Sequence, residues 1–380
     1  MGAEKWTNTF LDEMREAGDP PADSVVTGLF ESGTYSAWDL MKTLVGNDYP
    51  APDQLPPQLK DYLESTSRIP PVDQTTVAGG QRLFERCGPE ILLVLACYSL
   101  PSSYAARKGV QVLYRTGYLN NRANHRLFET TQMVMDVMVP DGLNSSGRGV
   151  RSAQKIRLMH AAVRRLILTD AETPWDKDFG VPINQEDLAG TFLVFTRLII
   201  DGLHRLGIVT SPEEDQGFLE TWKVIGRLMG IQESMIPATM AEAKTLCDLI
   251  QTRQVQTCPE GKAMNDALLQ MLEGKMPPGP WRSWPAALMR FFFPPHVADG
   301  FELPHHGLEE RLLESASEFR NEIGTHDPRL WAIRKCALLV MQSFVSAELG
   351  GKRTPFILPT NLHHEWAKSH RISVWDQLRR

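Results

Sequence analysis

Hydrophobic residues recur along most of this chain at the spacing of an α-helix, and strand-like alternation is hard to find. Apolar side chains three, four and seven positions apart share one face of a helix. This spacing predicts helices over residues 81–100, 122–138, 153–168, 184–207, 211–230, 285–293, 309–323 and 330–349, with another starting near residue 237. The predicted fold class is therefore all-α.

Two of these helices carry recognisable signals at their ends. Asn184 is predicted as an N-cap, with Glu186 and Asp187 near the positive end of the helix dipole. Gly207 is predicted to end that stretch, because glycine adopts the left-handed conformation found after helices. Ser211 begins a capping-box pattern for the next helix.

The first part of the chain has a different character from the rest. Prolines are frequent among the first 79 residues, which favours short helices and loops over long regular elements. We therefore predict an N-terminal wrap over residues 1–79, a helical domain over residues 80–349 and a C-terminal tail over residues 350–380.

Composition and charge narrow the classes of function. The formal net charge is −6 and no long basic run is present, which argues against a nucleic-acid partner. The longest mostly apolar run, residues 91–100, is too short to span a bilayer, so no transmembrane segment is expected. The N-terminus lacks a basic stretch followed by an apolar one. The expected location is cytoplasmic as written, or secreted if a signal peptide was removed.

The cysteines exclude several kinds of site. The chain has five, at scattered positions and without a Cys-x-x-Cys pair. This pattern argues against a disulfide framework, a structural zinc site and covalently attached haem. A chain of 380 residues with 42% hydrophobic residues can nevertheless build a core large enough to enclose a cofactor.

The segment RLMHAAVR, residues 157–164, combines an imidazole with two guanidinium groups on a predicted helix. His160 lies at the edge of an apolar stripe made by Ile156, Met159, Val163 and Ile167. Imidazole is a good ligand for transition metals, and arginines bind carboxylates. Haem, an apolar disc with a central metal and carboxylates on its rim, fits this face. An ordinary core histidine beside solvent-exposed arginines fits the same spacing. The spacing alone therefore does not distinguish a haem-binding face from an ordinary helix face.

Further motifs occur with RLMHAAVR in a familiar order. They are TTQMVMDVM at 130–138, GVPINQEDLAGTF at 180–192, WKVIGRLMGI at 222–231 and the stretch from Pro285 to Pro294. Taken together, they resemble the latex-clearing protein family, which comprises the bacterial rubber oxygenases and related oxygenases that cleave prenyl chains. The similarity extends from about Gly80 to Leu303.

The resemblance implies a globin-like helical core with additional surrounding helices and non-covalently bound haem b. It makes His160 the proximal ligand of the iron, accompanied by Arg157 and Arg164 as cofactor-binding residues. On the preceding helix, Arg126 and Thr130 match family residues that lie near the haem, and both are candidate cofactor-binding and catalytic residues. An equally good interpretation of Thr130 is a side chain whose hydroxyl donates a hydrogen bond to a backbone carbonyl of its own helix.

Three further residues are candidates on the same basis. Family members use a pocket glutamate as a proposed base, but residues 103–117 of this chain contain no carboxylate. Either Glu129 replaces that base, or the chemistry does not need it. Glu129 also fits a residue that points to solvent or pairs with a neighbouring arginine. His204 and Arg290 match family positions and are taken as further cofactor-binding residues. A structural role fits the family histidine near position 204 as well, and the resemblance assigns no specific role to Arg290.

The implied function is a haem-dependent dioxygenase. It would use dioxygen to cleave carbon–carbon double bonds of polyisoprene or a related isoprenoid into an aldehyde and a ketone. The expected partners are an apolar isoprenoid substrate and dioxygen. The alternative is a haem-binding gas sensor or a peroxidase-like protein on the same fold, because a fold does not fix its chemistry.

Overall fold

The computed structural model describes residues 5–32, 56–67, 74–116, 123–139 and 141–318, together with Ile333 and Ala337. Across these ranges the regular structure is helical, and the β-type pairing recorded is one isolated bridge between Ala106 and Val255. The predicted all-α class is confirmed. None of the helices in these ranges is long and apolar enough to cross a membrane.

The α-helices are, in chain order, α1 (Asn8–Arg15), α2 (Pro20–Glu31), α4 (Pro57–Thr66), α5 (Gln74–Val94), α6 (Leu100–Ala105), α7 (Val110–Arg115), α8 (Ala123–Met138), α9 (Arg148–Thr169), α10 (Gln185–Phe195), α11 (Arg197–Arg205), α12 (Pro212–Leu228), α13 (Met240–Gln254), α14 (Pro259–Lys275), α15 (Trp284–Phe292), α16 (Pro295–Gly300) and α17 (Gly307–Glu318). Short 3₁₀ turns occupy Lys177–Phe179, Glu233–Met235 and Pro280–Ser283. A π-helical turn over Leu95–Ser99 joins α5 to α6.

Most predicted helices are present, with differences at their ends. The helix of His160, α9, begins at Arg148 rather than at residue 153. The stretch predicted as one helix over 184–207 is two, α10 and α11, because the backbone of Thr196 departs from helical geometry at φ −118° and ψ −82°. Helix α13 starts after the N-cap Thr239 instead of near residue 237. Helix α14 was not anticipated.

The predicted capping signals are confirmed. The side chain of Asn184 accepts a hydrogen bond of 2.9 Å from the backbone N–H of Asp187. Ser211 and Glu214 form a reciprocal capping box, with bonds of 3.2 Å and 2.8 Å. Gly207 has a φ of +79°, the left-handed conformation expected after a helix end.

The π-helical turn Leu95–Ser99 interrupts an otherwise continuous run of helix between α5 and α6. All five of its residues are buried. A π-helical turn holds more residues than an α-helical turn, so it changes the direction in which the following side chains point. A separate kink lies earlier in α5, where Cys87 has non-helical angles and Pro89 follows.

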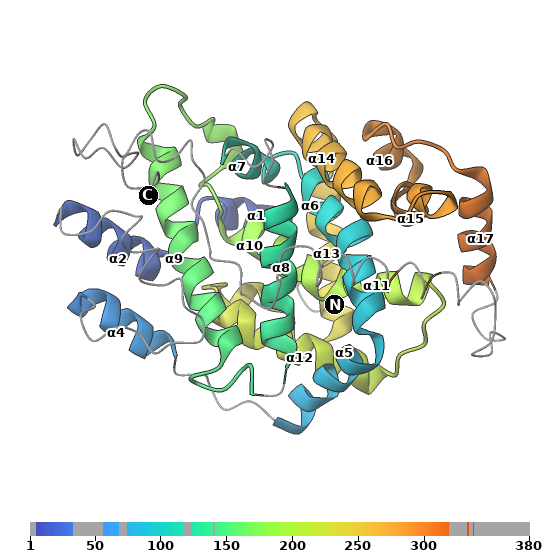
Figure 1. Ribbon diagram of the computed structural model, residues 1–380. Helices are drawn as coiled ribbons and strands as arrows, with labels where there is room; N and C mark the ends of the chain where they lie inside the picture. Colours follow the sequence, from blue (N-terminus) through green and yellow to red (C-terminus); the bar gives the residue numbers. More distant parts are fainter. Residues whose placement is uncertain are drawn as a thin grey trace, which may run out of the picture.

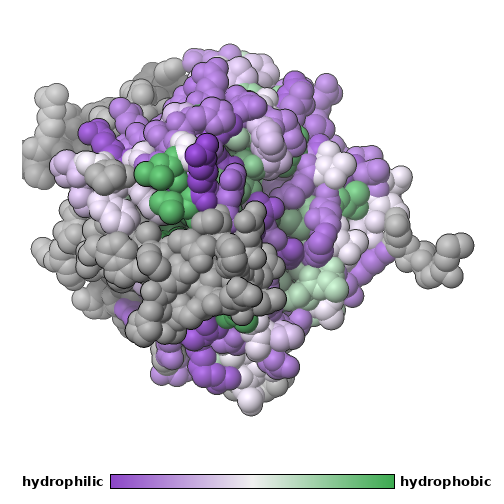
Figure 2. Space-filling model, turned by 90° about the vertical axis from the view of Figure 1, so that its right-hand side faces the viewer, coloured by the Kyte–Doolittle hydropathy of each residue, from purple (hydrophilic) through white to green (hydrophobic). Residues whose placement is uncertain are grey.

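Figure 1 shows how the helices are arranged around α8 and α9, which stand side by side near the centre. Helices α2 and α4 lie on the outer side of α9, and α14 to α17 gather at the opposite side of the molecule. The face shown in Figure 2 is mostly hydrophilic where residues are described, with small hydrophobic clusters.

The domain limits predicted from the sequence stay predictions. Helices α1 and α2 pack directly against α10 and α9, as an N-terminal wrap would. Of the predicted helix over 330–349, Ile333 and Ala337 are described and both are helical. The predicted tail, 350–380, lies outside the described residues.

Helices α5 and α12 approach closely because both carry glycines at the contact. A Cβ added to Gly217 on α12 would lie 2.8 Å from the carbonyl oxygen of Thr76 and 2.9 Å from the backbone nitrogen of Gly80. A Cβ on Gly80 would in turn lie 2.6 Å from the carbonyl oxygen of Gly217. Backbone atoms cannot move aside as a flexible side chain can, so the two helices would have to separate.

We expect Gly217→Ala to destabilise the protein by about 1–3 kcal/mol, the usual effect of overpacking a core. This loss should exceed the gain in helix propensity, which is about 1 kcal/mol for the same substitution. Gly274→Ala on α14 is the matched control, because nothing lies within 4 Å of its added Cβ. Chemical denaturation measures both. Equal midpoints for the two variants would contradict the proposed close contact.

Candidate active site

The hairpin formed by α8 and α9 sets the position of the predicted site residues. The two helices meet at a tight turn, where the backbone N–H of Gly149 donates to the carbonyl of Gly142 at 2.9 Å. A Cβ on Gly149 would lie 3.0 Å from the Cα of Val137, so the helices are in close contact at this end. Because they run antiparallel from there, residues near 130 on α8 come opposite residues near 160 on α9.

A cavity of about 310 Å³ lies beside this hairpin. Its volume is at the lower end of the range for small-molecule sites, about 300–1,000 Å³. Side chains from α6 to α11 and from α13 line it, together with residues of the intervening loops. The apolar lining includes Leu100, Val112, Leu113, Met133, Leu188, Leu193, Val194, Phe195, Leu198, Met229 and Ile250. Such a cavity suits an apolar ligand.

The structure brings His160, Glu129 and Thr130 together on the wall of this cavity. Most of the predicted apolar stripe of α9 faces the same space, since Ile156, Met159 and Val163 also line it, whereas Ile167 packs in a cluster with Val112 and Val163. The cavity-facing side chains of α8 and α9 therefore combine apolar groups with an imidazole, a carboxylate and a hydroxyl. His160 is half-buried there.

Arg157 and Arg164, which the resemblance implied as cofactor-binding residues, do not line this cavity. Arg157 forms a two-pronged ion pair with Asp19, with N–O distances of 2.6 and 2.7 Å. Arg164 pairs with Asp23 and donates to the carbonyls of Pro182 and Ile183, both at 2.9 Å.

Burial explains why these two guanidinium groups are directed at carboxylates. Both arginines are at least nine-tenths buried, and a buried charge must be paired. Although burial acts to lower the pKa of Arg157, its hydrogen bonds to Asp19 and the neighbouring charges raise it. We therefore leave Arg157 and Arg164 out of the set of residues proposed to contact a cofactor.

The other predicted residues lie away from the cavity or have side chains outside the described residues. The Nε2 atom of His204 is 2.6 Å from the hydroxyl of Thr210, outside the cavity lining. Arg290 donates to the carbonyl of Leu303 at 2.7 Å and pairs with Asp299 at 2.8 Å, again outside the lining. Both residues therefore have polar partners away from the cavity, and a contact with a cofactor stays a prediction for them. The side chain of Arg126 falls outside the described residues.

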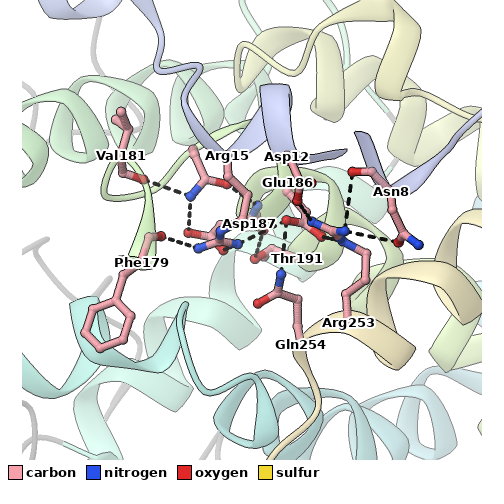
Figure 3. A network of polar contacts seen from close by, with 11 residues as sticks. Asn8, Asp12, Arg15, Phe179, Val181, Glu186, Asp187, Thr191, Arg253 and Gln254 are labelled. Atoms are coloured by element: carbon pink, nitrogen blue, oxygen red, sulfur yellow. Dashed lines mark hydrogen bonds and ion pairs between the residues drawn. The ribbon is translucent and has the colours of Figure 1, made fainter. Parts of the chain in front are cut away.

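A buried polar network borders the cavity on the side of α10 and α13 (Figure 3). At its centre is Glu186, whose side chain is fully buried. Its carboxylate accepts hydrogen bonds from Arg15 at 3.2 Å, Arg253 at 2.9 Å and Gln254 at 3.0 Å. Arg15 also pairs with Asp187 at 3.1 Å. The network thus joins α1, α10 and α13 behind one wall of the cavity.

The sequence pattern did not reveal this network. Glu186 and Asp187 were interpreted as charges near a helix start, which describes their place on α10 but not their burial. Their partners come from α1 and α13, and no local pattern links those segments. Burial raises the pKa of Asp187, while the charge and hydrogen bond of Arg15 act to lower it.

Two further observations concern metal and thiol chemistry at the site. Within the described ranges, no group of three or more His, Cys, Asp or Glu side chains could hold a metal ion. Cys247 lines the cavity, and burial raises the pKa of its thiol to about 12. This thiol is therefore protonated at neutral pH and a poor nucleophile.

Comparisons with known proteins agree with the fold and with the motifs. The chain is 25% identical over 308 residues to the rubber oxygenase of Streptomyces sp. (strain K30), a match that covers 78% of this chain and 74% of that protein. The solved structure of latex clearing protein LCP in the closed state superimposes with a TM-score of 0.75 at 20% identity, covering 91% of this chain and 94% of that one. The sequence model for the catalytic domain of "ER-bound oxygenase mpaB/B'/Rubber oxygenase" matches residues 92–320, more than half of the chain. This chain therefore belongs to the ER-bound oxygenase mpaB/B'/rubber oxygenase family.

Proposed function

We propose that this oxygenase is a haem b-dependent dioxygenase that cleaves carbon–carbon double bonds of polyisoprene or a related isoprenoid. The observation that carries the proposal is the imidazole of His160 on the wall of a mostly apolar cavity, together with Glu129 and Thr130. Membership of an oxygenase family supports the reaction class, and the described site residues support the cofactor.

The residues present fit non-covalent haem. Haem would need a protein side chain to bind its iron, and histidine is a common choice. His160 is the imidazole that the cavity offers, and it sits among the apolar side chains of Ile156, Met159 and Val163. These groups suit the flat, apolar surface of the macrocycle.

When bound, haem supplies the iron chemistry that allows dioxygen to react with an alkene. The overall reaction takes one alkene and one dioxygen to one aldehyde and one ketone. Both oxygen atoms end in the products and the double bond is the bond broken, so no external reductant is required.

The chain's own residues would orient the substrate and transfer protons. The aliphatic and aromatic lining from α6, α10 and α11 would hold an isoprenoid chain and exclude water from the reacting double bond. The carboxylate of Glu129 would accept or return a proton at the allylic carbon next to that bond. The hydroxyl of Thr130 would donate a hydrogen bond to a polar group formed during the reaction.

The proposed function is tested with purified, haem-containing protein incubated with squalene or polyisoprene under labelled dioxygen (¹⁸O₂). We expect carbonyl products by mass spectrometry, with one labelled oxygen in the aldehyde and one in the ketone. A haem-containing protein that yields no such products with either alkene would contradict this function. It would favour the gas sensor or peroxidase-like alternative.

For the cofactor site we expect His160→Gly to remove the side chain proposed to bind the haem iron. The variant should show a shifted or weakened Soret band, and free imidazole added to the solution should restore much of the native spectrum by occupying the vacated position. His204→Gly is the matched control, because its ring bonds to Thr210 outside the cavity, and its spectrum should match that of the wild type. An unchanged His160→Gly spectrum would rule out ligation by this residue.

For proton transfer we expect Glu129→Gln to lower kcat by roughly 10²–10⁴-fold, the usual contribution of a general acid or base. Its haem content should stay at the wild-type level, because the substitution preserves size and removes only the charge. Glu64→Gln on the exposed side of α4 serves as the control and should not change the rate. Steady-state assays of carbonyl formation measure both rates. Equal activity of the two variants would contradict the proposed proton-transfer role of Glu129.

A further inference from the structure

Two ion pairs, one buried and one partly exposed, hold the helix of His160 along one side of its axis. Arg157 binds both carboxylate oxygens of Asp19, and Arg164 binds Asp23. Successive residues of an α-helix are about 100° apart around its axis, so both arginines lie about 40–60° to the same side of His160. They are also roughly 10 Å apart along the axis.

The two acids come from one short stretch of chain. Asp19 is the N-cap position of α2, and Asp23 lies in the first turn of that helix. Between and beyond the ion pairs, the apolar face of α2 packs on α9 through Ala22, Val26, Leu29, Leu158, Ala161 and Ala162. The pairing order, 19 with 157 and 23 with 164, makes α2 and α9 run in the same direction.

Two anchoring points on one line fix a helix more completely than one point does. A single pair would hold α9 at one point along its axis and would resist rotation or tilting of the helix less strongly. Two pairs on the same side, about two turns apart, oppose both movements. Because His160 is at a fixed angle from that line, holding the arginines also determines which way the imidazole faces.

The same stretch is tied to the opposite side of the cavity. The backbone N–H of Val181 donates to the carbonyl of Arg15 at 2.9 Å, and that of Gln185 donates to Ala17 at 3.0 Å. Arg15 also bonds to Glu186 and Asp187 on α10. Residues 15–23 therefore contact both α9 and the start of α10, two walls of the cavity.

The surroundings leave little room for this arrangement to change. Gly230, at φ +82°, follows α12, and a Cβ there would lie 2.6 Å from both the Nε of Arg157 and a carboxylate oxygen of Asp19. Arg157 also donates to the carbonyl of Leu228 at 3.3 Å. The C-terminal end of α12 thus packs directly over the ion pair between Arg157 and Asp19.

We propose that Asp19 and Asp23 are positioning residues, which act through Arg157 and Arg164 to aim the imidazole of His160 into the cavity. This inference rests on the proposed function, because it assumes that His160 holds the cofactor. Neither acid lines the cavity, so neither contacts substrate or cofactor directly. Their effect reaches the site through the orientation of α9.

The test compares Asp19→Asn, Asp23→Asn and the double variant with Thr27→Val. Thr27 also bridges α2 and α9, through a 3.3 Å bond from Arg165, so its loss tests this helix contact without removing either ion pair. The readouts are the electron paramagnetic resonance spectrum of the ferric protein and the rate at which haem transfers to an excess of an acceptor protein. Unfolding temperatures are recorded in parallel.

We expect the Asp19→Asn and double variants to lose haem about 10–100-fold faster, the range typical when groups that orient a metal ligand are removed. Their resonance spectra should broaden, showing several ligand orientations, and Asp19→Glu should recover part of the native spectrum. Thr27→Val should match the wild type in both. If Asp19→Asn does not fold, Asp23→Asn decides the question. Asp23 is more exposed than Asp19, so its loss should produce the same broadened spectrum and faster haem loss to a smaller extent.

Two outcomes would overturn the inference. One contradicts only the positioning role, and the other contradicts the proposed function as well. Lower unfolding temperatures with wild-type resonance spectra and haem-loss rates would show that the acids only stabilise the fold. A wild-type protein without a Soret band would overturn the proposed function, and the positioning role would fail with it.

Discussion

Two guanidinium groups buried on the helix of His160 determine how this half of the molecule is built. Desolvating an arginine is costly unless a carboxylate accompanies it. Asp19 and Asp23 supply those carboxylates, so the start of α2 must lie along α9. Once α2 is there, residues 15–18 reach the start of α10 and the cavity acquires its second wall. Pairing the two arginines with these carboxylates therefore also brings together the helices that surround the cavity.

Features that depend on neighbouring residues in the chain could be predicted from the sequence. Most of the apolar stripe of α9 and its histidine face the cavity as their spacing indicated. The caps at Asn184 and Ser211 form as expected, because a cap is an interaction between residues three positions apart. The motifs also indicated the correct family, and Glu129, Thr130 and His160 do lie together.

Features that depend on distant partners could not be predicted. The arginines beside His160 were assigned to a cofactor's carboxylates, but the carboxylates that bind them are 138 and 141 positions away in the chain. Those acids lie in a proline-rich stretch without a strong periodic pattern. Glu186 likewise owes its burial to Arg15 and Arg253, from two other helices. A charge pattern in one segment shows that a partner is needed, but it does not identify that partner.

The π-helical turn at Leu95–Ser99 separates two roles of the continuous helical segment that joins α5 to α6. Before it, α5 packs against α12; after it, Leu100, Ser102 and Tyr104 of α6 face the cavity. One additional residue in a turn rotates everything downstream by about 100°. The inserted residue therefore lets a single stretch of chain serve the packing against α12 before the turn and the cavity lining after it. A homologue lacking that residue would present a different set of α6 side chains to its ligand, while the α5–α12 contact stayed the same.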